Sequence, residues 1–396
     1  MNKTLRPLYV LFLSLSLFSC EKTEDQSPEP VVLVDSELVG SFSKAGLQEK
    51  LQNEVGDVGD QVSLLIQNGV DLYKLRYNTL DLYGQPIVAS GAVILPESAK
   101  GQTFSMASLQ HGTLFNKDDA PSNFKANTEA TFGEVFGALG LVVGMPDYIG
   151  YGASVAADHP YEHNKGLAIA NADFIRAMKE FIEQNEIKWN GNLMLAGYSE
   201  GGYATMATHK YLQENYSSEL PVRISLCGAG AYNKTASFNL LVNEEGSPDS
   251  GKNRSYLWVL DTYNKAYTLG LNYSEIFKEP YASEIEDEGY LSQINVSLNE
   301  TFTSDFVSDF NSGRLLDLSD AVADNDIYNW KPEGEVKLYH GNMDDYVPYI
   351  NSQTAYTQML ANGAEKVSLT TIDGGDHDSS ISVFLLGVLQ AFLGSK

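Results

Sequence analysis

The stretch LAGYSEGGYATMA, residues 195–207, constrains the fold more than any other part of this 396-residue chain. An apolar run leads to a serine with a glycine two residues before it and another two residues after it, and an apolar pattern with helical spacing follows at once. A sharp turn of this kind, between a strand and a helix, makes the serine hydroxyl project clear of the sheet. Larger side chains in place of Gly197 and Gly201 would clash there, because the helix lies close to the strand. The stretch therefore predicts that Ser199 is a nucleophile, although a G-x-S-x-G pattern alone also occurs in ordinary turns.

Strand-like and helix-like segments alternate on both sides of this turn. Residues 36–55 have loosely helical spacing, and the stretches VDLYKLRYNTLD and QPIVASGAVILPE are typical of two paired strands. A buried strand is predicted over residues 103–112, and from there apolar runs alternate with helical patterns up to residue 231. This order predicts an α/β protein with a mostly parallel central sheet covered by helices on both faces.

The alternation is interrupted between residues 232 and 332 by a segment rich in Asn, Ser, Tyr and acidic residues. Its apolar positions still recur at helical spacing, so we interpret it as a mainly helical insertion, called the cap below. The sheet then resumes over residues 333–396, which makes residues 36–231 and 333–396 the two parts of one core. An insertion that leaves a parallel sheet and returns to it is expected over the strand ends, where ligands bind in open α/β sheets.

The N-terminus resembles an export signal. Residues 1–19 contain two basic residues and an apolar stretch too short to span a bilayer. Cys20 follows a small residue and precedes an acidic tract, so we expect a lipoprotein-type signal, a lipidated Cys20 and a flexible linker over residues 20–35. A plain signal peptide with an incidental cysteine is the alternative. The expected location is a bacterial cell envelope or surface, with secretion as the alternative and membrane contact only through the lipid.

Composition limits the remaining classes of function. The net charge is −26 at pH 7 and becomes more negative when the signal is removed, which argues against nucleic acid and strongly anionic substrates. The only other cysteine is Cys227, so the mature chain has no internal disulfide if Cys20 is lipidated, and its stability must come from a large core. A hydrophobic content of 43% in a chain of this length is sufficient for one.

A reactive serine needs a base, usually a histidine held by a carboxylate. Of the six histidines, only His377 stands in a glycine-bearing loop between a predicted last strand and the last helix. The acid is expected in the loop after the preceding strand, where Asp344 and Asp345 stand side by side. We prefer Asp344, and Asp345 is the alternative if the loop is shifted by one residue.

The chain order of elbow serine, acid and histidine resembles that of the α/β-hydrolase fold. The stretch GNMDDYVP, which contains Asp344, is similar to that family's G-x-x-D-x-x-V-P pattern, and GGDH is similar to its G-x-x-H pattern at His377. The stretches QHGT, MPDYIGYG and GYSEGG resemble secretory lipases and related acyl-esterases with a helical cap. The resemblance covers residues 60–231 and 333–396.

Acyl transfer also requires two donors aimed at the developing oxyanion. One donor is expected to be the backbone N–H of Glu200, directly after the nucleophile. The other is expected in the loop after the predicted strand at residues 103–112, where Thr113 is the first choice and Gly112 the alternative. The sequence lacks the HGGG form of this loop.

These residues predict an exported serine esterase that acts on a neutral ester, either a small molecule or a polymer-borne group, without a cofactor. His159 and His163 lie four residues apart with acids nearby, but Pro160 between them argues against a shared helical face, so no metal site is expected. A peptidase of the prolyl oligopeptidase type is one alternative, although no propeller-like repeats precede the catalytic part. A surface binding lipoprotein without turnover is the other, and a broken triad would favour it.

Overall fold

The structure of the protein is a computed structural model that describes residues 31–126 and 128–395, without the side chains of residues 54–61. The predicted signal, Cys20 and most of the predicted linker lie outside the described residues. Within the described residues, no helix combines the length and the apolar character needed to cross a membrane.

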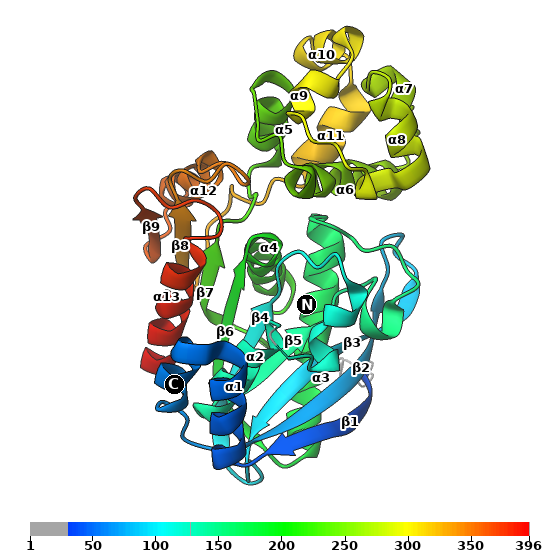
Figure 1. Ribbon diagram of the computed structural model, residues 1–396. Coiled ribbons are helices and arrows are strands. Elements are labelled where there is room, and N and C mark those ends of the chain that lie inside the picture. The colour runs from blue at the N-terminus through cyan, green and yellow to red at the C-terminus, as the bar shows by residue number, and fades with distance from the viewer. Residues whose placement is uncertain (1–30, 127, 396) are drawn as a thin grey trace, which may run out of the picture. The chain divides into compact units, whose positions relative to one another are not determined.

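In the described part of the chain, nine strands form one sheet in the order β1-β2-β3-β5-β4-β6-β7-β8-β9 (Figure 1). Strands β1, β2, β3 and β5 pair antiparallel in turn, and all pairings from β5 through β4 and β6 to β9 are parallel. This confirms the predicted mostly parallel sheet. The strands are β1 (Leu33–Phe42), β2 (Val70–Leu80), β3 (Pro86–Pro96), β4 (Thr103–Gln110), β5 (Val142–Pro146), β6 (Lys188–Tyr198), β7 (Val222–Gly228), β8 (Glu335–Gly341) and β9 (Val367–Ile372).

Helices cover both faces of the sheet, as predicted. On one face, Leu47, Phe136 and Phe392 belong to a buried cluster with Ile94 and Met194 of the sheet. These side chains come from α1 (Lys44–Ser63), α2 (Ala130–Ala138) and α13 (Ile381–Gly394). The other face is covered by α3 (Asn164–Gln184), α4 (Glu200–Asn215) and α12 (Ile350–Ala361).

The helix expected over residues 36–55 is wrong in its first part. Residues 33–42 form β1, which begins before the expected end of the linker at residue 35 and pairs along its length with β2. The side chains of Val34, Leu38 and Val39 are exposed, so their spacing does not report a buried helical face. Pairing with β2 satisfies the backbone groups of this segment, a tertiary contact that outweighs weak local periodicity. Helix α1 begins only at Lys44, after Ser43, whose hydroxyl accepts the N–H of Gly46 at 3.2 Å.

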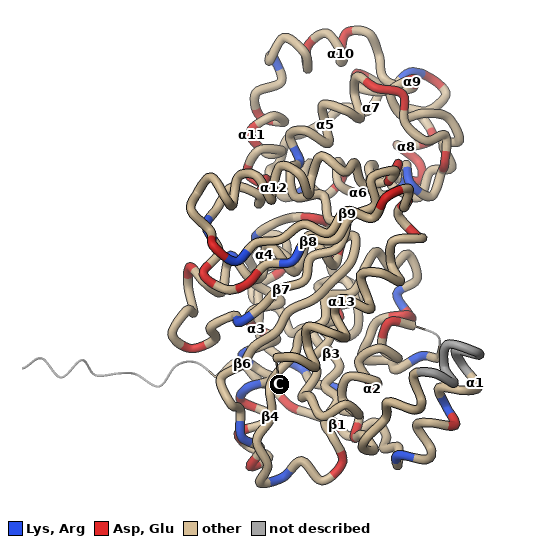
Figure 2. Tube along the Cα trace, turned by 90° about the vertical axis from the view of Figure 1, so that its left-hand side faces the viewer, with Lys and Arg blue, Asp and Glu red and all other residues tan. Residues whose placement is uncertain are grey.

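The helices of the cap lie between β7 and β8 in the chain and above the carboxyl ends of the strands in Figure 1. Buried cap residues such as Trp258 and Tyr263 share one hydrophobic cluster with Tyr203 and Ala204 of α4, so the cap packs directly on the core. Acidic residues outnumber basic ones along the cap (Figure 2). The cap helices are α5 (Lys234–Asn243), α6 (Ser250–Ala266), α7 (Tyr273–Ile276), α8 (Tyr281–Glu288), α9 (Leu298–Thr301), α10 (Ser304–Asn311) and α11 (Leu316–Asp324).

Candidate active site

Ser199 occupies a sharp turn between β6 and α4. Its backbone has φ 59° and ψ −125°, a conformation that is disfavoured for a residue with a side chain and is often found at functional sites. The N–H of Ser199 donates to the carbonyl oxygen of Gly228 at 2.9 Å, which holds the turn against β7. A Cβ atom at Gly201 would lie well inside van der Waals contact with the carbonyl oxygen of Gln110, and one at Gly197 would meet the backbone of Gly201 in the same way. Glycine at both positions therefore lets helix and strands approach closely.

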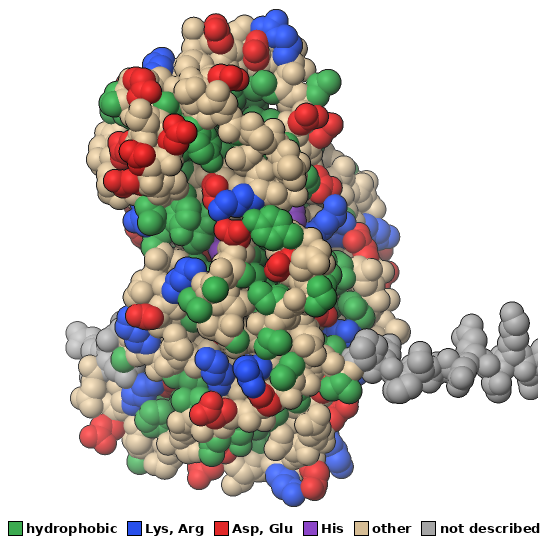
Figure 3. Space-filling view, turned by 90° about the vertical axis from the view of Figure 1, so that its right-hand side faces the viewer, with side chains coloured by type: hydrophobic (Ala, Val, Ile, Leu, Met, Phe, Trp, Pro, Cys, Tyr) green, Lys and Arg blue, Asp and Glu red, His purple; other side chains and the backbone are tan. Residues whose placement is uncertain are grey.

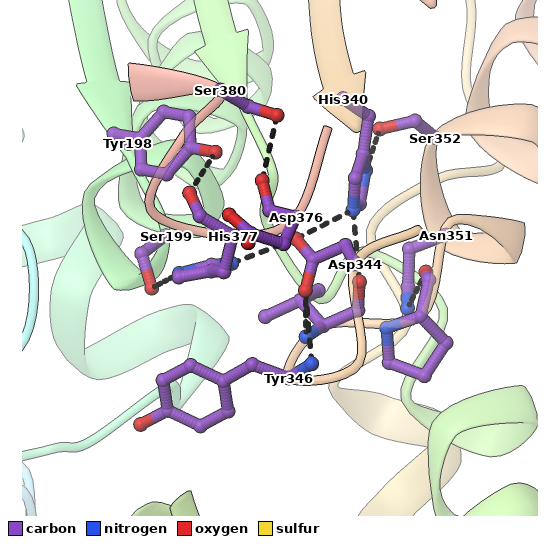
Figure 4. Close-up of polar contacts among 12 residues, drawn as sticks. Tyr198, Ser199, His340, Asp344, Tyr346, Asn351, Ser352, Asp376, His377 and Ser380 are labelled. Atoms are coloured by element: carbon purple, nitrogen blue, oxygen red, sulfur yellow. Dashed lines mark hydrogen bonds and ion pairs between the residues drawn. The ribbon is translucent and has the colours of Figure 1, made fainter. Parts of the chain in front are cut away.

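The structure brings Ser199, His377 and Asp344 together in one hydrogen-bonded chain (Figure 4). Nε2 of His377 lies 2.9 Å from Oγ of Ser199, and Nδ1 lies 2.7 Å from Oδ2 of Asp344. Asp344 follows β8 and His377 follows β9, so two neighbouring parallel strands deliver both side chains to the same sheet edge as the elbow. With Nδ1–H donated to the carboxylate, Nε2 is left to accept the serine proton.

Asp344 is held as an anion by its surroundings. Burial by itself would raise the pKa of this carboxyl, but hydrogen bonds from His340 and His377, together with their charge when protonated, hold it well below its usual range. The backbone N–H groups of Tyr346 and Val347 also donate to Oδ1, at 2.9 and 2.8 Å. The acid is thus fixed in position, and its ionised form is favoured.

Asp345, the alternative acid, has a different environment. Its side chain is 57% exposed, and Oδ2 lies 2.7 Å from Nζ of Lys252 on α6 of the cap. The adjacent aspartates therefore point to different partners: Asp344 contacts His377, and Asp345 contacts the cap.

The loop after β4 carries the other predicted oxyanion residues. The N–H of Gly112 donates to Oε1 of Glu129 at 3.0 Å, so it is already engaged. Oγ1 of Thr113 is hydrogen-bonded to the hydroxyl of Tyr161 at 2.8 Å, while no described residue accepts the backbone N–H of Thr113. Glu200 is the first residue of α4, where the N–H groups of a helix lack intrahelical partners.

A second buried pair beside the nucleophile was not predicted from the sequence. Nε2 of His159 lies 2.7 Å from Oε1 of Glu200, and both side chains are almost fully buried. Nδ1 of His159 donates to the carbonyl oxygen of Ile149 at 2.8 Å, and a carbonyl can only accept, so this nitrogen carries a proton. The contact of Nε2 with Oε1 fixes the position of the Glu200 side chain. No spacing rule links a loop histidine to the residue after a nucleophile.

Two other histidines also have structural partners. Nδ1 of His163 accepts the N–H of Gly166 at 3.1 Å and caps α3, so His163 and His159 do not converge. His340, on β8, lies 3.3 Å from the acid Asp344 and donates from Nε2 to the carbonyl oxygen of Val347 at 2.8 Å. Over residues 31–126 and 128–395, no group of three or more His, Cys, Asp or Glu side chains could hold a metal ion.

A cavity of about 520 Å³ opens beside Ser199 between core and cap. In the space-filling view, hydrophobic side chains gather where the cap meets the core (Figure 3). Much of the cavity wall is apolar, and it includes Phe238, Leu241, Val259 and Leu298. Charged groups also line it, namely Glu162, Lys234, Glu244, Glu245 and Asp345. The cavity can hold the apolar part of an ester next to the nucleophile.

Comparison with known proteins relates both the chain and its fold to lipases and esterases. The sequence profile of the secretory lipase family matches residues 124–382. The fold is similar to that of a Legionella pneumophila protein assigned as a hydrolase, with a TM-score of 0.77 and 23% identity over 91% of this chain and 97% of that one. It is also similar to the rice cell wall degrading esterase LipA of Xanthomonas oryzae, with a TM-score of 0.73 and 22% identity over 92% and 97%. Candida antarctica lipase A in its closed state gives a TM-score of 0.63 and 17% identity over 92% and 83%. Comparison with curated protein sequences gave no match.

Proposed function

Because the chain belongs to the secretory lipase family and is a carboxylic ester hydrolase with the α/β-hydrolase fold, we propose that it cleaves esters through an acyl-enzyme on Ser199. The observation that carries the proposal is the unbroken chain of hydrogen bonds from Oγ of Ser199 through His377 to Asp344. The sharp turn at residue 199, which presents the hydroxyl at the cavity, supports the same role.

In the proposed reaction, Oγ of Ser199 attacks the ester carbonyl carbon while Nε2 of His377 takes its proton. Asp344 keeps the imidazole in the required tautomer and stabilises the imidazolium ion that forms. His377 then donates the proton to the leaving alcohol, which leaves the acyl group on the serine. Water attacks the acyl-enzyme with the help of the same histidine, and the carboxylic acid is released.

The backbone N–H groups of Glu200 and Thr113 are our proposed donors to the oxyanion. Gly112 is less suitable in this structure because its N–H is held by Glu129. In other acyl-transfer enzymes, loss of one oxyanion donor lowers kcat by about 10²–10³-fold. A donor at Thr113 can therefore be told apart from one at Gly112 by its effect on kcat.

For location and substrate, we propose an exported protein anchored through a lipid on Cys20, with secretion as the alternative. The membership in a secretory family supports export. The strongly negative chain favours a neutral ester, either a small molecule or a group on a polymer, over an anionic one.

The proposed nucleophile is tested by the hydrolysis of p-nitrophenyl esters from acetate to palmitate. We expect the wild type to cleave part of the series, and the chain length it prefers to separate an esterase from a lipase. Ser199→Ala should lose activity by at least about 10³-fold at unchanged folding. Ser382→Ala, at an exposed position on α13, is the matched control and should retain activity. Equal activity of the wild type and Ser199→Ala would contradict the assignment of the nucleophile.

A further inference from the structure

A buried ion pair lies in the wall of the cavity beside Ser199. Glu162 belongs to the loop before α3 in the core, and Lys234 is the first residue of α5 in the cap. Nζ of Lys234 contacts Oε2 of Glu162, and their side chains are only 2% and 10% exposed. Both residues line the same cavity as the proposed nucleophile. The pair takes no part in the catalytic chain described above.

The surroundings fix this pair in place. Nζ of Lys234 also lies 4.6 Å from the ring centroid of Tyr203, and the hydroxyl of Tyr263 donates to the backbone carbonyl of Glu162 at 3.1 Å. No described residue donates to Oε1, the second carboxylate oxygen of Glu162. The small exposed fraction of this side chain therefore presents an acceptor on the cavity wall.

The unpaired carboxylate oxygen of Glu162 determines which substrate groups suit the cavity. An alkyl chain placed against it would displace water and leave a charged acceptor unpaired, which is more costly than leaving a neutral group unpaired. A hydroxyl group can donate to Oε1 and can accept from the neighbouring ammonium group. The remaining wall, with Phe238, Val259 and Leu298, suits an apolar skeleton. An anionic group would meet the carboxylates of Glu244 and Glu245 as well.

We propose that Glu162 and Lys234 form a subsite for a substrate hydroxyl, so that the preferred esters carry a hydroxyl on the apolar part that enters the cavity. This inference rests on the proposed function, because it places the substrate next to Ser199. It assigns the two residues a role in specificity, and the bond-breaking chemistry stays with the proposed triad.

Two matched sets of probes test the subsite. The first set is methyl 3-phenylpropanoate and its ortho-, meta- and para-hydroxyphenyl analogues, with the hydroxyl on the acyl side. The second set is phenethyl acetate and its hydroxyphenyl analogues, with the hydroxyl on the alcohol side. In at least one set the wild type should prefer one hydroxylated ester over its parent by about tenfold or more in kcat/KM, mainly through KM. A wild type that prefers the parent ester, or shows no preference, in both sets would overturn the proposal.

The double variant Glu162→Leu/Lys234→Met removes both charges at once, which proteins tolerate better than the loss of one partner. It should lose the preference for the hydroxylated ester. The matched control is Lys165→Met/Asp324→Leu, which removes another ion pair between core and cap, with Nζ and Oδ2 3.1 Å apart. Neither residue lines the cavity, so this variant should keep the preference for the hydroxylated ester. Retention of the full preference by the first double variant would contradict the subsite. If that variant does not fold, the kcat/KM ratios of the wild type for the hydroxylated and parent esters still decide whether the subsite exists.

p-Nitrophenyl acetate separates this inference from the proposed function. A wild type that is inactive on every ester contradicts the proposed function and the inference together. A wild type that cleaves p-nitrophenyl acetate through Ser199 but ignores the hydroxyl leaves the function standing and overturns only the subsite.

Discussion

At the scale of single residues, we expect different effects from substitution of the two adjacent aspartates after β8. Asp344→Asn should lower kcat by about 10⁴-fold, because an amide does not enforce the imidazole tautomer that leaves Nε2 free to accept a proton. Asp345→Asn is the matched control and should change kcat little, since its carboxylate pairs with Lys252 on the cap. Initial rates on p-nitrophenyl acetate measure both effects. A large loss in Asp345→Asn with a small one in Asp344→Asn would contradict the assignment.

The buried pair of His159 and Glu200 can be tested in the same way through stability. Glu200→Gln should be tolerated, because the amide can donate to Nε2 of a neutral His159 and keep the hydrogen bond. Glu200→Leu leaves that nitrogen buried without a partner and should lower the free energy of unfolding by about 1–3 kcal/mol. Urea unfolding of the two variants provides the comparison. Equal losses would show that the hydrogen bond is not what holds this side chain.

At the scale of elements, the turn between β6 and α4 depends on close backbone approach. Gly201→Ala should destabilise the protein by about 3 kcal/mol or more, because the added methyl group meets the backbone of Gln110 and His111, which cannot move independently of β4. Gly40→Ala in β1 is the control, since a Cβ atom there meets nothing within 4 Å. The melting temperatures of the two variants, each compared with the wild type, measure the destabilisation. A stable Gly201→Ala protein would show that the turn has more room than the structure gives it.

The elements also show how far local sequence determines this fold. The elbow, the two loops after β8 and β9 and the α/β alternation could be predicted, because each depends on residues close together in the chain. Strand β1 could not, because its conformation depends on pairing with β2, which begins 28 residues after β1 ends. The contact of His159 with Glu200 likewise depends on how a loop folds back over the elbow. The stack of Tyr161, Trp258 and Tyr290 joins core and cap across distant segments, with ring centroids 4.5 and 4.2 Å apart.

At the scale of the whole molecule, buried histidines make stability depend on pH. Burial lowers the pKa of His163 to about 4 and that of His209 to about 3, below the value of about 6.5 in an unfolded chain. Between pH 6.5 and 4 these two histidines therefore bind more protons in the unfolded chain than in the folded one. Their contribution to stability is complete above about pH 6.5 and falls as the pH is lowered. Each histidine contributes a slope of about 1.4 kcal/mol per pH unit in this window.

His163→Asn should reduce this acid sensitivity, because asparagine can also cap α3 but does not titrate. The measurement is the difference in unfolding free energy between pH 7 and pH 5, by urea, for the wild type and the variant. An unchanged difference would mean that folding does not shift the pKa of His163.

The carboxylates in the cavity wall have a consequence for the release of the acid product. A neutral ester meets no electrostatic barrier from Glu244 and Glu245 when it enters. Hydrolysis then creates a new negative charge among these groups, and the released acid is repelled toward the solvent. The same repulsion opposes the return of that acid, so we expect the released acid to inhibit the enzyme only weakly. Added salt screens exposed charges and should therefore strengthen inhibition by the released acid.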